Sequence, residues 1–328
     1  MTHGPDGVRV AAIDLGTVSS RLLCATVRDG RVVESVKRTV ITDLGEGVDA
    51  TGRFAEPAVR RVLDACGAFM REIAAFGPDC ICTTLTSAAR DVSNGELLLD
   101  GLEALGLRPQ VIPGEVEARL TFYGVAHDFP GQRIVVADSG GGSTELAPGA
   151  WVPGEPLALD HVRSLNIGCR RVTERFLAGN PPAAAELSAA TTWAREQFDA
   201  YWKGLPQRPE RLVAVGGTVT SLVAMVHQLE RYDSHFVHLR DLTLEEVRTC
   251  IEHMVPLTVD EIAGLSGIQA KRAPVILAGA LIIRELMETG GYNRLTVSEN
   301  SLLAGMAATV YEVLRGQTPA IGWTPELS

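Results

Sequence analysis

Two aspartates, Asp14 and Asp138, each end an apolar segment of the sequence and stand directly before a run of small residues. A carboxylate at the end of a buried strand, beside a glycine turn, is well placed to hold a magnesium ion, which prefers one or two carboxylates together with phosphate oxygens and water. Either aspartate alone could be an ordinary turn residue, because aspartate is common where strands end. Since the two occur in matching contexts, we predict that both belong to a metal and phosphate site.

Each aspartate is followed by a segment whose backbone N–H groups have little side-chain cover. The first segment is Gly16-Thr-Val-Ser-Ser20 and the second is Gly140-Gly-Gly-Ser-Thr144. Uncovered N–H groups and hydroxyl donors can form a nest that binds phosphate oxygens without a side-chain cation. Neither segment is a Walker loop, since Gly-Lys-Ser/Thr follows neither of them. The residues predicted to bind phosphate in these two loops are Gly16, Thr17, Ser19, Ser20, Gly140, Gly141, Gly142, Ser143 and Thr144.

Two glutamates are candidates for acid–base work at a bound phosphate. Glu145 stands at the exit of the second loop, and Glu117 lies in a predicted helix. Hydrolysis of a phosphoanhydride requires a water molecule that is oriented and partly deprotonated for in-line attack, which a nearby carboxylate can do. The alternative for Glu117 is a solvated helix residue paired with Arg119 or Arg163. We predict the catalytic role for both glutamates.

Arg90 follows Thr86-Ser-Ala-Ala89 at the end of another predicted strand. A guanidinium group in that position can fork onto phosphate oxygens. The alternative is an ion pair with Asp91 or Glu117. We predict a phosphate contact.

The strands and turns that must position these residues occur twice along the chain. Residues 8–14 form an apolar strand, and residues 21–27 and 31–39 flank Asp29-Gly30, a dipeptide typical of two-residue hairpins. A strand over 133–138 leads into the second glycine loop in the same way. We interpret the repeat as two related α/β domains that each contribute a phosphate loop to a shared cleft. The alternative, one doubly wound domain, is disfavoured because such sheets join parallel strands through helices.

Periodicity predicts the remaining elements and the division of the chain. Helices are predicted over 57–76, 97–105, 115–127, 170–177, 183–201, 219–229, 243–255, 258–265, 270–288 and 300–314. Strands are predicted over 80–85, 110–112, 144–147, 157–165, 212–215 and 295–297. The first predicted domain comprises residues 1–127 with a C-terminal helix over 306–328, and the second comprises residues 128–305. Residues 317–328 are predicted to form a loose tail.

Composition limits the classes of function. The 328 residues are 46% hydrophobic and 21% charged, which favours a folded protein over a disordered one. No apolar run approaches the roughly 20 residues that span a bilayer, and no secretory segment follows the N-terminus, so we predict a cytoplasmic protein without membrane contact. The six cysteines lack metal-ligand spacing, and Cys80 and Cys82 are predicted to be buried thiols.

The net charge of −10 disfavours nucleic-acid binding and requires that a site for a polyanion be made locally positive. Two clusters of basic residues and a further basic pair could supply a positive funnel on the acidic protein. The alternative is that they are scattered surface charges. The residues concerned are Arg163, Arg170, Arg171, Arg175, His235, His238, Arg240, Lys271 and Arg272.

Six segments resemble, in this order, the motifs of the exopolyphosphatase/guanosine pentaphosphate phosphohydrolase (Ppx/GppA) family. The resemblance covers residues 8 to about 312, and the combination of the third and fourth segments is specific. The segments are Asp14-Leu-Gly-Thr-Val-Ser-Ser20, Thr86-Ser-Ala-Ala-Arg-Asp91, Gly114-Glu-Val-Glu-Ala-Arg119, Asp138-Ser-Gly-Gly-Gly-Ser-Thr-Glu145, Leu165-Asn-Ile-Gly-Cys-Arg-Arg171 and Val215-Gly-Gly-Thr-Val-Thr220.

The resemblance implies an α/β fold of two ribonuclease-H-like domains with an interdomain cleft, as in the actin, sugar kinase and heat-shock ATPase superfamily. It implies that Glu117 is the general base and that Arg90 and Ser143 contact phosphate. Mg²⁺ (or Mn²⁺) would be surrounded by Asp14, Asp138 and Glu145, and the last helix would return to the first domain. The superfamily's nucleotide-side motif corresponds to Gly216, Gly217 and Thr218, and a homodimer is implied as well.

The chain departs from the family pattern at two positions and in its length. Val18 replaces a residue that usually donates a hydrogen bond in the first loop, and Leu303 stands where an arginine is common. The C-terminal domain of longer members is not present in the sequence, which leads us to expect a preference for short polyphosphate chains.

These observations predict a metal-dependent exopolyphosphatase that removes the terminal phosphate of inorganic polyphosphate. The first alternative is hydrolysis of the guanosine pentaphosphate pppGpp to the tetraphosphate ppGpp, which is the same chemistry on a nucleotide. A kinase of the same superfamily is disfavoured, because no sugar-binding set accompanies Glu117. A non-catalytic sensor of ppGpp or polyphosphate is the remaining alternative, and Val18 is the feature that favours it.

Overall fold

The first hairpin of the chain turns at Asp29 and Gly30, as its sequence predicts. In the computed structural model, which describes residues 7–328, these two residues have φ angles of 50° and 73°. Two successive positive φ angles are what a type I′ turn requires. The turn joins β2 (Ser19–Arg28) to β3 (Arg31–Ile41), and β1 (Val8–Leu15) pairs antiparallel with β2 on its other side. The predicted antiparallel start of the chain is confirmed.

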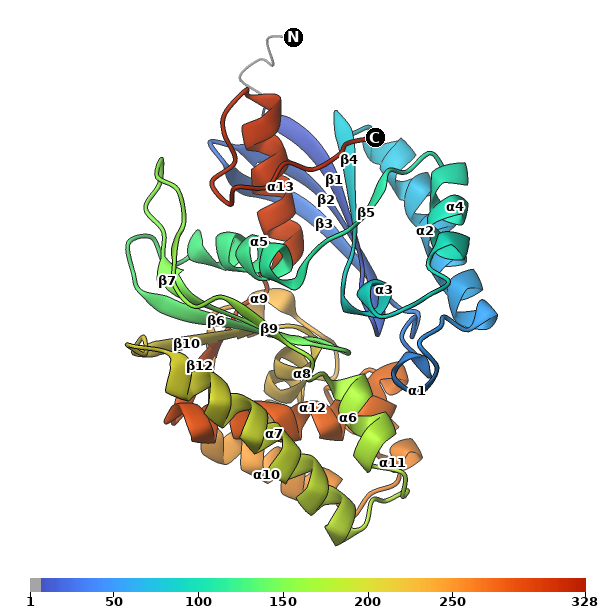
Figure 1. Cartoon of the computed structure of the whole chain (residues 1–328), viewed down its shortest axis with the longest axis vertical. Helices are drawn as coiled ribbons and strands as arrows, with labels where there is room; N and C mark the ends of the chain where they lie inside the picture. Colours follow the sequence, from blue (N-terminus) through green and yellow to red (C-terminus); the bar gives the residue numbers. More distant parts are fainter. Residues whose placement is uncertain (1–6) are drawn as a thin grey trace. The chain divides into compact units, whose positions relative to one another are not determined.

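These strands belong to a five-stranded sheet with the order β3-β2-β1-β4-β5, visible in Figure 1. The fourth and fifth strands, β4 (Cys80–Leu85) and β5 (Pro109–Val111), run parallel to β1. Parallel neighbours require crossover connections, and helices supply them. The helices of this part of the chain are α1 (Val48–Thr51), α2 (Glu56–Phe76), α3 (Ser87–Arg90), α4 (Glu96–Ala104), α5 (Gly114–Ala126) and α13 (Leu302–Leu314).

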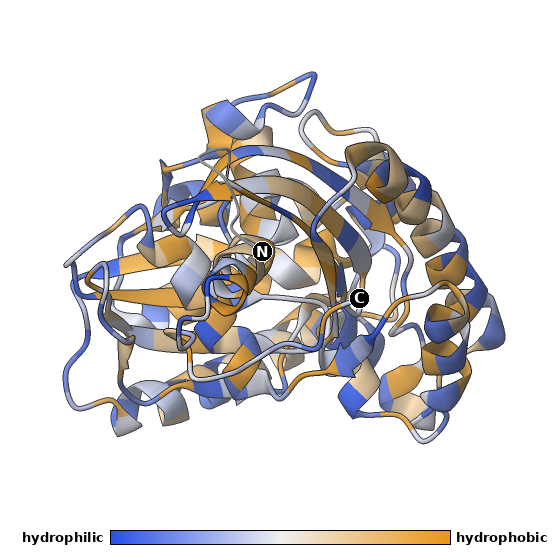
Figure 2. Cartoon of the chain, turned by 90° about the horizontal axis from the view of Figure 1, so that it is seen from above, coloured by the Kyte–Doolittle hydropathy of each residue, from blue (hydrophilic) through white to orange (hydrophobic). Residues whose placement is uncertain are grey.

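The sheet carries helices on both of its faces (Figure 1). One core joins the strand residues Ile13 and Leu22 to Phe69 of α2 and Leu98 of α4, all of them buried. Helix α13 contacts β1, β2, β3 and α5. Helix ribbons alternate between hydrophobic and hydrophilic segments in Figure 2, as expected of helices that bury one face.

Helices α5 and α13 approach so closely that two of their residues must be glycine. A Cβ atom added to Gly305 would clash with the carbonyl oxygen of Leu120 and would lie 2.7 Å from its carbonyl carbon. A Cβ atom on Gly124 would clash in the same way with the backbone oxygen of Ser301. Because backbone atoms cannot turn aside as side chains do, the helices would have to separate.

We expect Gly305→Ala to lower the free energy of unfolding by about 1–3 kcal/mol, which is typical of overpacking in a core. Equilibrium denaturation measures this change. The matched control is Gly67→Ala in α2, where an added Cβ meets nothing within 4 Å. That substitution should be neutral or should stabilise by up to about 1 kcal/mol through helix propensity. Equal effects at the two sites would contradict the close-packing explanation.

The second sheet has seven strands among the described residues, in the order β11-β12-β10-β6-β7-β8, with β9 paired to β7. Its strands are β6 (Ile134–Ser139), β7 (Thr144–Ala150), β8 (Ala158–Leu159), β9 (Arg163–Leu165), β10 (Arg211–Val215), β11 (Arg240–Thr243) and β12 (Arg294–Val297). Its helices are α6 (Cys169–Phe176), α7 (Ala184–Gly204), α8 (Gly217–Val226), α9 (Ser234–Val237), α10 (Leu244–Met254), α11 (Val259–Ala263) and α12 (Ala273–Gly290), with a 3₁₀ turn over Ala270–Arg272.

Two predicted elements differ from the structure in a way that the backbone explains. The strand predicted over 157–165 is divided into β8 and β9, because His161 between them has a φ angle of 44°. A positive φ at a residue other than glycine interrupts an extended strand. The helix predicted over 270–288 begins at Ala273, where Pro274 occupies the first turn and the preceding residues form the 3₁₀ turn.

The last residues of the chain are paired, which corrects the expectation of a loose tail over 317–328. The backbone N–H of Ser328 donates to the carbonyl of Ile81 at 2.9 Å, and the N–H of Ile81 donates back at 2.9 Å. Leu327 forms an antiparallel bridge with Cys82 of β4. The tail therefore extends the sheet beside β4, and sheet hydrogen bonds replace the solvation that a free tail would have.

The chain divides into two compact units. Among the described residues, unit 1 comprises residues 7–132, 150–158 and 300–328, and unit 2 comprises residues 133–149 and 159–299. The predicted fold class of two ribonuclease-H-like α/β units is confirmed, whereas the domain boundaries and the cleft remain predictions. Among the described helices, none has both the length and the apolar character needed to cross a membrane.

Candidate active site

Asp14 lies at the end of β1, directly opposite Arg21 of β2. Only 1% of Asp14 is exposed, and its Oδ2 is 2.6 Å from Nη2 and 2.8 Å from Nε of Arg21. Its Oδ1 is also buried and has no hydrogen-bond partner among the described residues. An unpaired carboxylate oxygen in a protein interior costs free energy, so this atom is a candidate ligand.

The fit of this site to a magnesium ion depends on how many ligands the protein must supply. Within residues 7–328, no three Asp, Glu, His or Cys side chains converge as a complete metal cage would require. Magnesium is commonly held by one or two carboxylates, with water and substrate phosphate completing the octahedron. The buried Oδ1 of Asp14 fits that mode of binding.

Glu117 and Arg90 form an ion pair at the start of α5. Nη1 of Arg90 lies 2.8 Å from Oε2 of Glu117 and also donates to the carbonyl of Ile112 at 3.0 Å. Glu117 is 7% exposed, so it is not a solvated helix residue. Arg90 ends the short helix α3, directly after β4. The ion pair therefore joins α3 to α5 and fixes the direction of the Glu117 carboxylate.

The first glycine loop is held by the segment that follows β3. The N–H groups of Thr42 and Asp43 donate to the carbonyl of Val18, at 3.0 and 2.9 Å. The hydroxyl groups of Ser20 and Thr42 are 2.9 Å apart. Val18 is only 5% exposed, so its apolar side chain is accommodated in the interior. The departure from the family pattern at this position is thus a packing residue.

Unit 2 repeats the arrangement with a different pair of residues. Asp138 at the end of β6 lies directly opposite Glu145 of β7. Residues opposite each other in an antiparallel pair face the same side of the sheet, so the two carboxylates share one side. Both are buried, and Oε1 of Glu145 accepts a hydrogen bond from the hydroxyl of Ser164 at 2.7 Å.

The second glycine loop is fixed by the start of α6. The N–H of Cys169 donates to the carbonyl of Gly140 at 3.0 Å, and that of Arg170 to the carbonyl of Gly141 at 2.9 Å. Nε of Arg171 donates to the carbonyl of Gly142 at 2.9 Å. The loop's carbonyl groups are therefore turned toward α6 by hydrogen bonds from consecutive residues.

Gly168, which precedes α6, lies directly against this loop. A Cβ atom there would lie 2.5 Å from the backbone nitrogen of Gly142 and would clash with the carbonyl group of Gly141. The residue-based predictions missed Gly168 and Ser164 as parts of the site, and they named Arg171 only as a candidate for the positive funnel. The signal was present in the motif over 165–171, but its glycine was not interpreted as a contact with the loop.

The loop after β10 completes the predicted set in unit 2. Gly216 has a φ angle of 98°, and a Cβ atom there would lie 3.1 Å from Oδ1 of Asp138. Gly217 lies against the guanidinium group of Arg272, which a Cβ atom would clash with. The side chain of Thr218 packs against Gly279 of α12, where an added Cβ atom would clash with it. The structure thus brings Gly216 beside Asp138 and a cation beside Gly217.

The pattern of one protein family extends over both units. The Ppx/GppA phosphatase family matches residues 24–311. The chain belongs to the Ppx/GppA phosphatase family. The family prediction made from the six motifs is confirmed, and so is the predicted class of enzyme, a phosphoanhydride hydrolase.

Similar proteins cover nearly the whole Ppx/GppA chain. It is 35% identical to exopolyphosphatase 2 of Mycobacterium tuberculosis, with 92% of this chain and 98% of the relative covered. The crystal structure of an exopolyphosphatase from Cytophaga hutchinsonii matches with a TM-score of 0.83 and 26% identity, over 96% of this chain and 100% of that one. The crystal structure of the Aquifex aeolicus Ppx/GppA family member matches with a TM-score of 0.77 and 29% identity, over 94% and 98%.

The basic residues proposed for a positive funnel have different surroundings in this Ppx/GppA protein. Arg171 and Arg272 lie at the loops, as described above. Arg175 and Arg240 instead stack on aromatic rings, at 5.4 Å from the ring centre of Trp193 and 4.0 Å from that of Phe236. Basic residues that are clustered in the sequence therefore lie in different environments, some at the glycine loops and others against aromatic rings.

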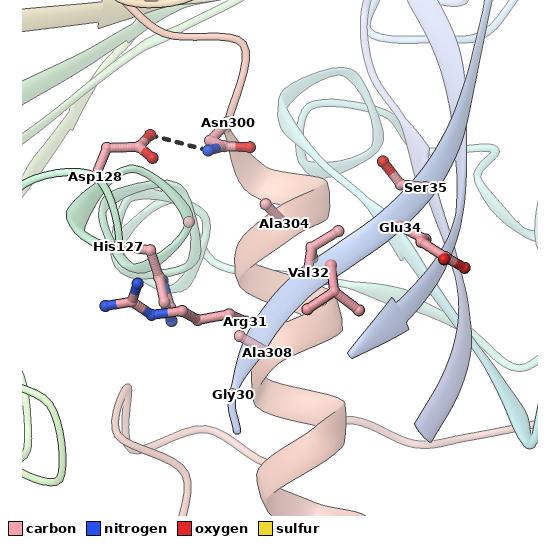
Figure 3. A pocket seen from close by; sticks show the side chains of 12 residues that line it. Gly30, Arg31, Val32, Glu34, Ser35, His127, Asp128, Asn300, Ala304 and Ala308 are labelled. Atoms are coloured by element: carbon pink, nitrogen blue, oxygen red, sulfur yellow. Dashed lines mark hydrogen bonds between the residues drawn. The ribbon is translucent and has the colours of Figure 1, made fainter. Parts of the chain in front are cut away.

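A cavity of about 310 Å³ lies elsewhere in unit 1 of the Ppx/GppA fold, and none of the predicted site residues lines it. It is bounded by the start of β3, the end of α5 and α13 (Figure 3). Asn300 donates to Oδ2 of Asp128 at 2.9 Å on one side of it. The ring of His127 stands on the other side with the side chain of Arg31, and its Nδ1 lies 2.7 Å from the carbonyl of Tyr123.

Burial lowers the pKa of His127, and the nearby charge of Arg31 lowers it further, whereas the carbonyls of Tyr123 and Gly30 and the charge of Asp128 oppose the shift. A histidine with a depressed pKa binds its proton less readily in the folded chain than in the unfolded chain. Its contribution to stability is therefore fully present above the ordinary histidine pKa of about 6.5, and it is lost as the pH falls below that value and through the lower pKa of the folded chain.

We expect His127→Gln to reduce the loss of thermal stability that accompanies acidification from about pH 7.5 to about pH 5.5. Thermal unfolding at a series of pH values measures the effect. The wild-type protein, unfolded over the same series of pH values, supplies the control. A parallel shift of the His127→Gln profile, without a change of its slope, would exclude this titration.

Proposed function

We propose that the protein is an exopolyphosphatase that releases the terminal phosphate of inorganic polyphosphate with the help of Mg²⁺ (or Mn²⁺). The observation that carries the proposal is the buried carboxylate of Glu117 at the start of α5. Its Oε2 lies 2.8 Å from Nη1 of Arg90, which holds the carboxylate in place. A carboxylate with a fixed direction can orient a water molecule and accept its proton. The resemblance to exopolyphosphatase 2 of M. tuberculosis, over 98% of that protein, supports polyphosphate as the substrate.

The backbone and the acidic side chains have the remaining tasks in this proposal. N–H groups of Gly141 and Gly142 and the hydroxyl of Ser143 bind phosphate oxygens, whereas the N–H of Gly140 donates to the carbonyl of Ser143 at 2.9 Å and closes the loop. The hydrogen bonds from α6 keep the loop in place beforehand. The buried Oδ1 of Asp14 supports a role for this residue in holding the metal ion. A bound magnesium ion would neutralise part of the negative charge on the phosphates.

Asp138 and Glu145 are proposed as the acidic residues of unit 2 that face the metal ion or its water ligands. Their direct opposition across β6 and β7 supports a common task. The hydrogen bond from Ser164 orients Glu145 at 2.7 Å. Ser164 is therefore a positioning residue in this proposal.

A second candidate substrate is the guanosine pentaphosphate pppGpp, whose hydrolysis uses the same chemistry. The observation that favours it is the loop at Gly216 and Gly217, with the guanidinium group of Arg272 against Gly217. A cation beside a glycine turn suits the phosphates of a nucleotide. Both candidates use the same phosphate loops, so a comparison of rates separates them.

Phosphate release from polyphosphate of short and long chain length, pppGpp and ATP tests the proposal. Each substrate is assayed with Mg²⁺, with Mn²⁺ and after chelation by EDTA. We expect release from polyphosphate that is lost with EDTA and restored by Mg²⁺. A higher specificity constant for pppGpp would favour the second candidate, and release unaffected by chelation would contradict the metal requirement. If no substrate releases phosphate, the protein is not an exopolyphosphatase. Equilibrium binding of ppGpp and polyphosphate would then test the alternative of a non-catalytic sensor.

A further inference from the structure

Arg21 contacts only one of the two carboxylate oxygens of Asp14. Its Nη2 and Nε lie 2.6 and 2.8 Å from the carboxylate, and both distances end on the same atom, Oδ2. An arginine paired with a carboxylate commonly places two parallel N–H groups on two different oxygens. Here the second oxygen, Oδ1, is buried without a hydrogen-bond partner among the described residues. The pair therefore leaves one oxygen of Asp14 occupied and the other available to a further ligand.

Strand register holds this arrangement in place. Asp14 and Arg21 are directly opposite each other in the antiparallel pair of β1 and β2, so their side chains leave the sheet on the same side. Ile13 and Leu22, the next pair in the ladder, belong to the buried core. Asp14 is 1% exposed and the side chain of Arg21 is 21% exposed. Burial and register together restrict rotation of the carboxylate, so Oδ2 stays with Arg21.

A role in stability alone does not account for the unpaired oxygen of Asp14. A buried carboxylate oxygen without a partner costs free energy. The guanidinium group of Arg21 has five N–H donors in a planar fork, which could engage both oxygens if neutralising the charge were its only task. The observed geometry instead suits a carboxylate that binds a cation through one oxygen while the other is kept from it.

The number of oxygens that Asp14 offers affects the choice between divalent cations. Mg²⁺ requires a nearly ideal octahedron, whereas Ca²⁺ takes about six to eight oxygens and accepts both oxygens of one carboxylate. Selectivity between the two ions depends on the number of ligands and on the flexibility of the site. An aspartate that is restricted to one oxygen supplies fewer and less adaptable ligands, which disfavours Ca²⁺.

We propose that Arg21 is a specificity-determining residue that restricts Asp14 to one donor oxygen, so that the site selects Mg²⁺ or Mn²⁺ against Ca²⁺. This role rests on the proposed binding of the metal ion at Asp14. The planar fork of arginine is required for it, because the ammonium group of lysine is a point charge on a flexible stem. The charge of Arg21 alone would lower the affinity for all divalent cations alike and would leave the ratio of their affinities unchanged.

Competition for bound Mn²⁺ measures this selectivity without any substrate. Mn²⁺ on the protein is followed by electron paramagnetic resonance, and Mg²⁺ or Ca²⁺ is added until half of it is displaced. In Arg21→Gln, the ratio of the dissociation constant for Ca²⁺ to that for Mg²⁺ should fall about tenfold or more, the size of effect found for residues that orient metal ligands. Arg21→Lys keeps the charge and should lower the ratio as well. Thermal unfolding verifies that both variants are folded.

Arg38→Gln is the matched control for the loss of charge. Arg38 lies in β3 of the same sheet, and its Nε is 2.9 Å from Oε2 of Glu72. The substitution changes the net charge by the same amount as Arg21→Gln and should leave the ratio at the wild-type value. Asp14→Asn is the control for the metal site and should weaken Mn²⁺ binding about tenfold or more.

Infrared difference spectroscopy gives a second readout, the mode in which Asp14 binds the ion. A carboxylate bound through one oxygen has a wider separation between its antisymmetric and symmetric stretching bands than one bound through both. The bands that disappear in Asp14→Asn belong to Asp14. They should show the wide separation with Ca²⁺ in the wild type and the narrow separation with Ca²⁺ in Arg21→Gln.

The outcomes separate this role of Arg21 from the proposed function. If Mn²⁺ does not bind the wild type, or binds Asp14→Asn equally well, Asp14 does not hold the metal ion and the role of Arg21 is excluded with it. If Mn²⁺ binds at Asp14 but both Arg21 variants keep the wild-type ratio, Arg21 does not determine the selectivity, while the proposed function stands. A ratio lowered in Arg21→Gln but retained in Arg21→Lys would also overturn the role, because charge would then be sufficient.

Discussion

Replacing Glu117 with glutamine is expected to lower the turnover number for phosphate release by about 10²–10⁴-fold, the range for loss of a general base. Glutamine has nearly the same shape as glutamate and can still accept a hydrogen bond from Arg90, whose Nη1 is 2.8 Å from Oε2 of the native residue. It cannot take up the proton of an attacking water. Substrate binding should therefore be retained while the rate falls, and equilibrium binding beside steady-state kinetics separates the two effects.

Glu115→Gln is the matched control for this substitution. Glu115 lies in the first turn of the same helix and is exposed, whereas Glu117 is 7% exposed. The control variant should keep the wild-type turnover number. Undiminished turnover in Glu117→Gln would exclude the residue as the base, and equal losses in both variants would point to a general effect on α5. Thermal unfolding of each variant verifies that the fold is intact.

Gly168→Ala is expected to lower kcat/KM by about 100-fold, because it displaces the second glycine loop. The added Cβ would lie 2.5 Å from the backbone nitrogen of Gly142, and it would also clash with the carbonyl of Gly141. Backbone atoms can relieve this only by moving, and they are the groups proposed to hold the phosphate oxygens. A shift of about 1 Å in a positioning group is enough for a loss of this size.

The control for Gly168→Ala is Gly264→Ala, in the same unit. There the nearest atom to an added Cβ is the carbonyl oxygen of Glu261 at 3.4 Å, and the backbone has a φ angle of −86° that alanine accepts. Its kcat/KM should equal that of the wild type. Full activity of Gly168→Ala would show that the loop tolerates the displacement and that its backbone is not the phosphate grip.

Features that depend on residues close to one another in the chain could be predicted from the sequence. Asp29-Gly30 between two apolar runs favours a tight hairpin, because a type I′ turn needs two positive φ angles, which these two residues adopt here. The aspartate and glycine loops at 14–20 and 138–145 were identified in the same way, as were the main helices. The family followed from six short motifs, each of which is local. For these features the physical cause lies within one turn or one helical repeat.

The partners that hold the predicted site together became known only from the folded arrangement of distant segments. Arg21 opposes Asp14 because of strand register, and Arg90 at the end of α3 reaches Glu117 of α5 across 27 positions of sequence. The contact of Gly168 with the second loop depends on where α6 begins relative to β6 and β7. Such contacts join segments that are far apart in the sequence. Packing and strand register bring these segments together, and the preferences of neighbouring residues do not predict this. The sequence could therefore name the acidic and glycine residues of the site but not the side chains that position them.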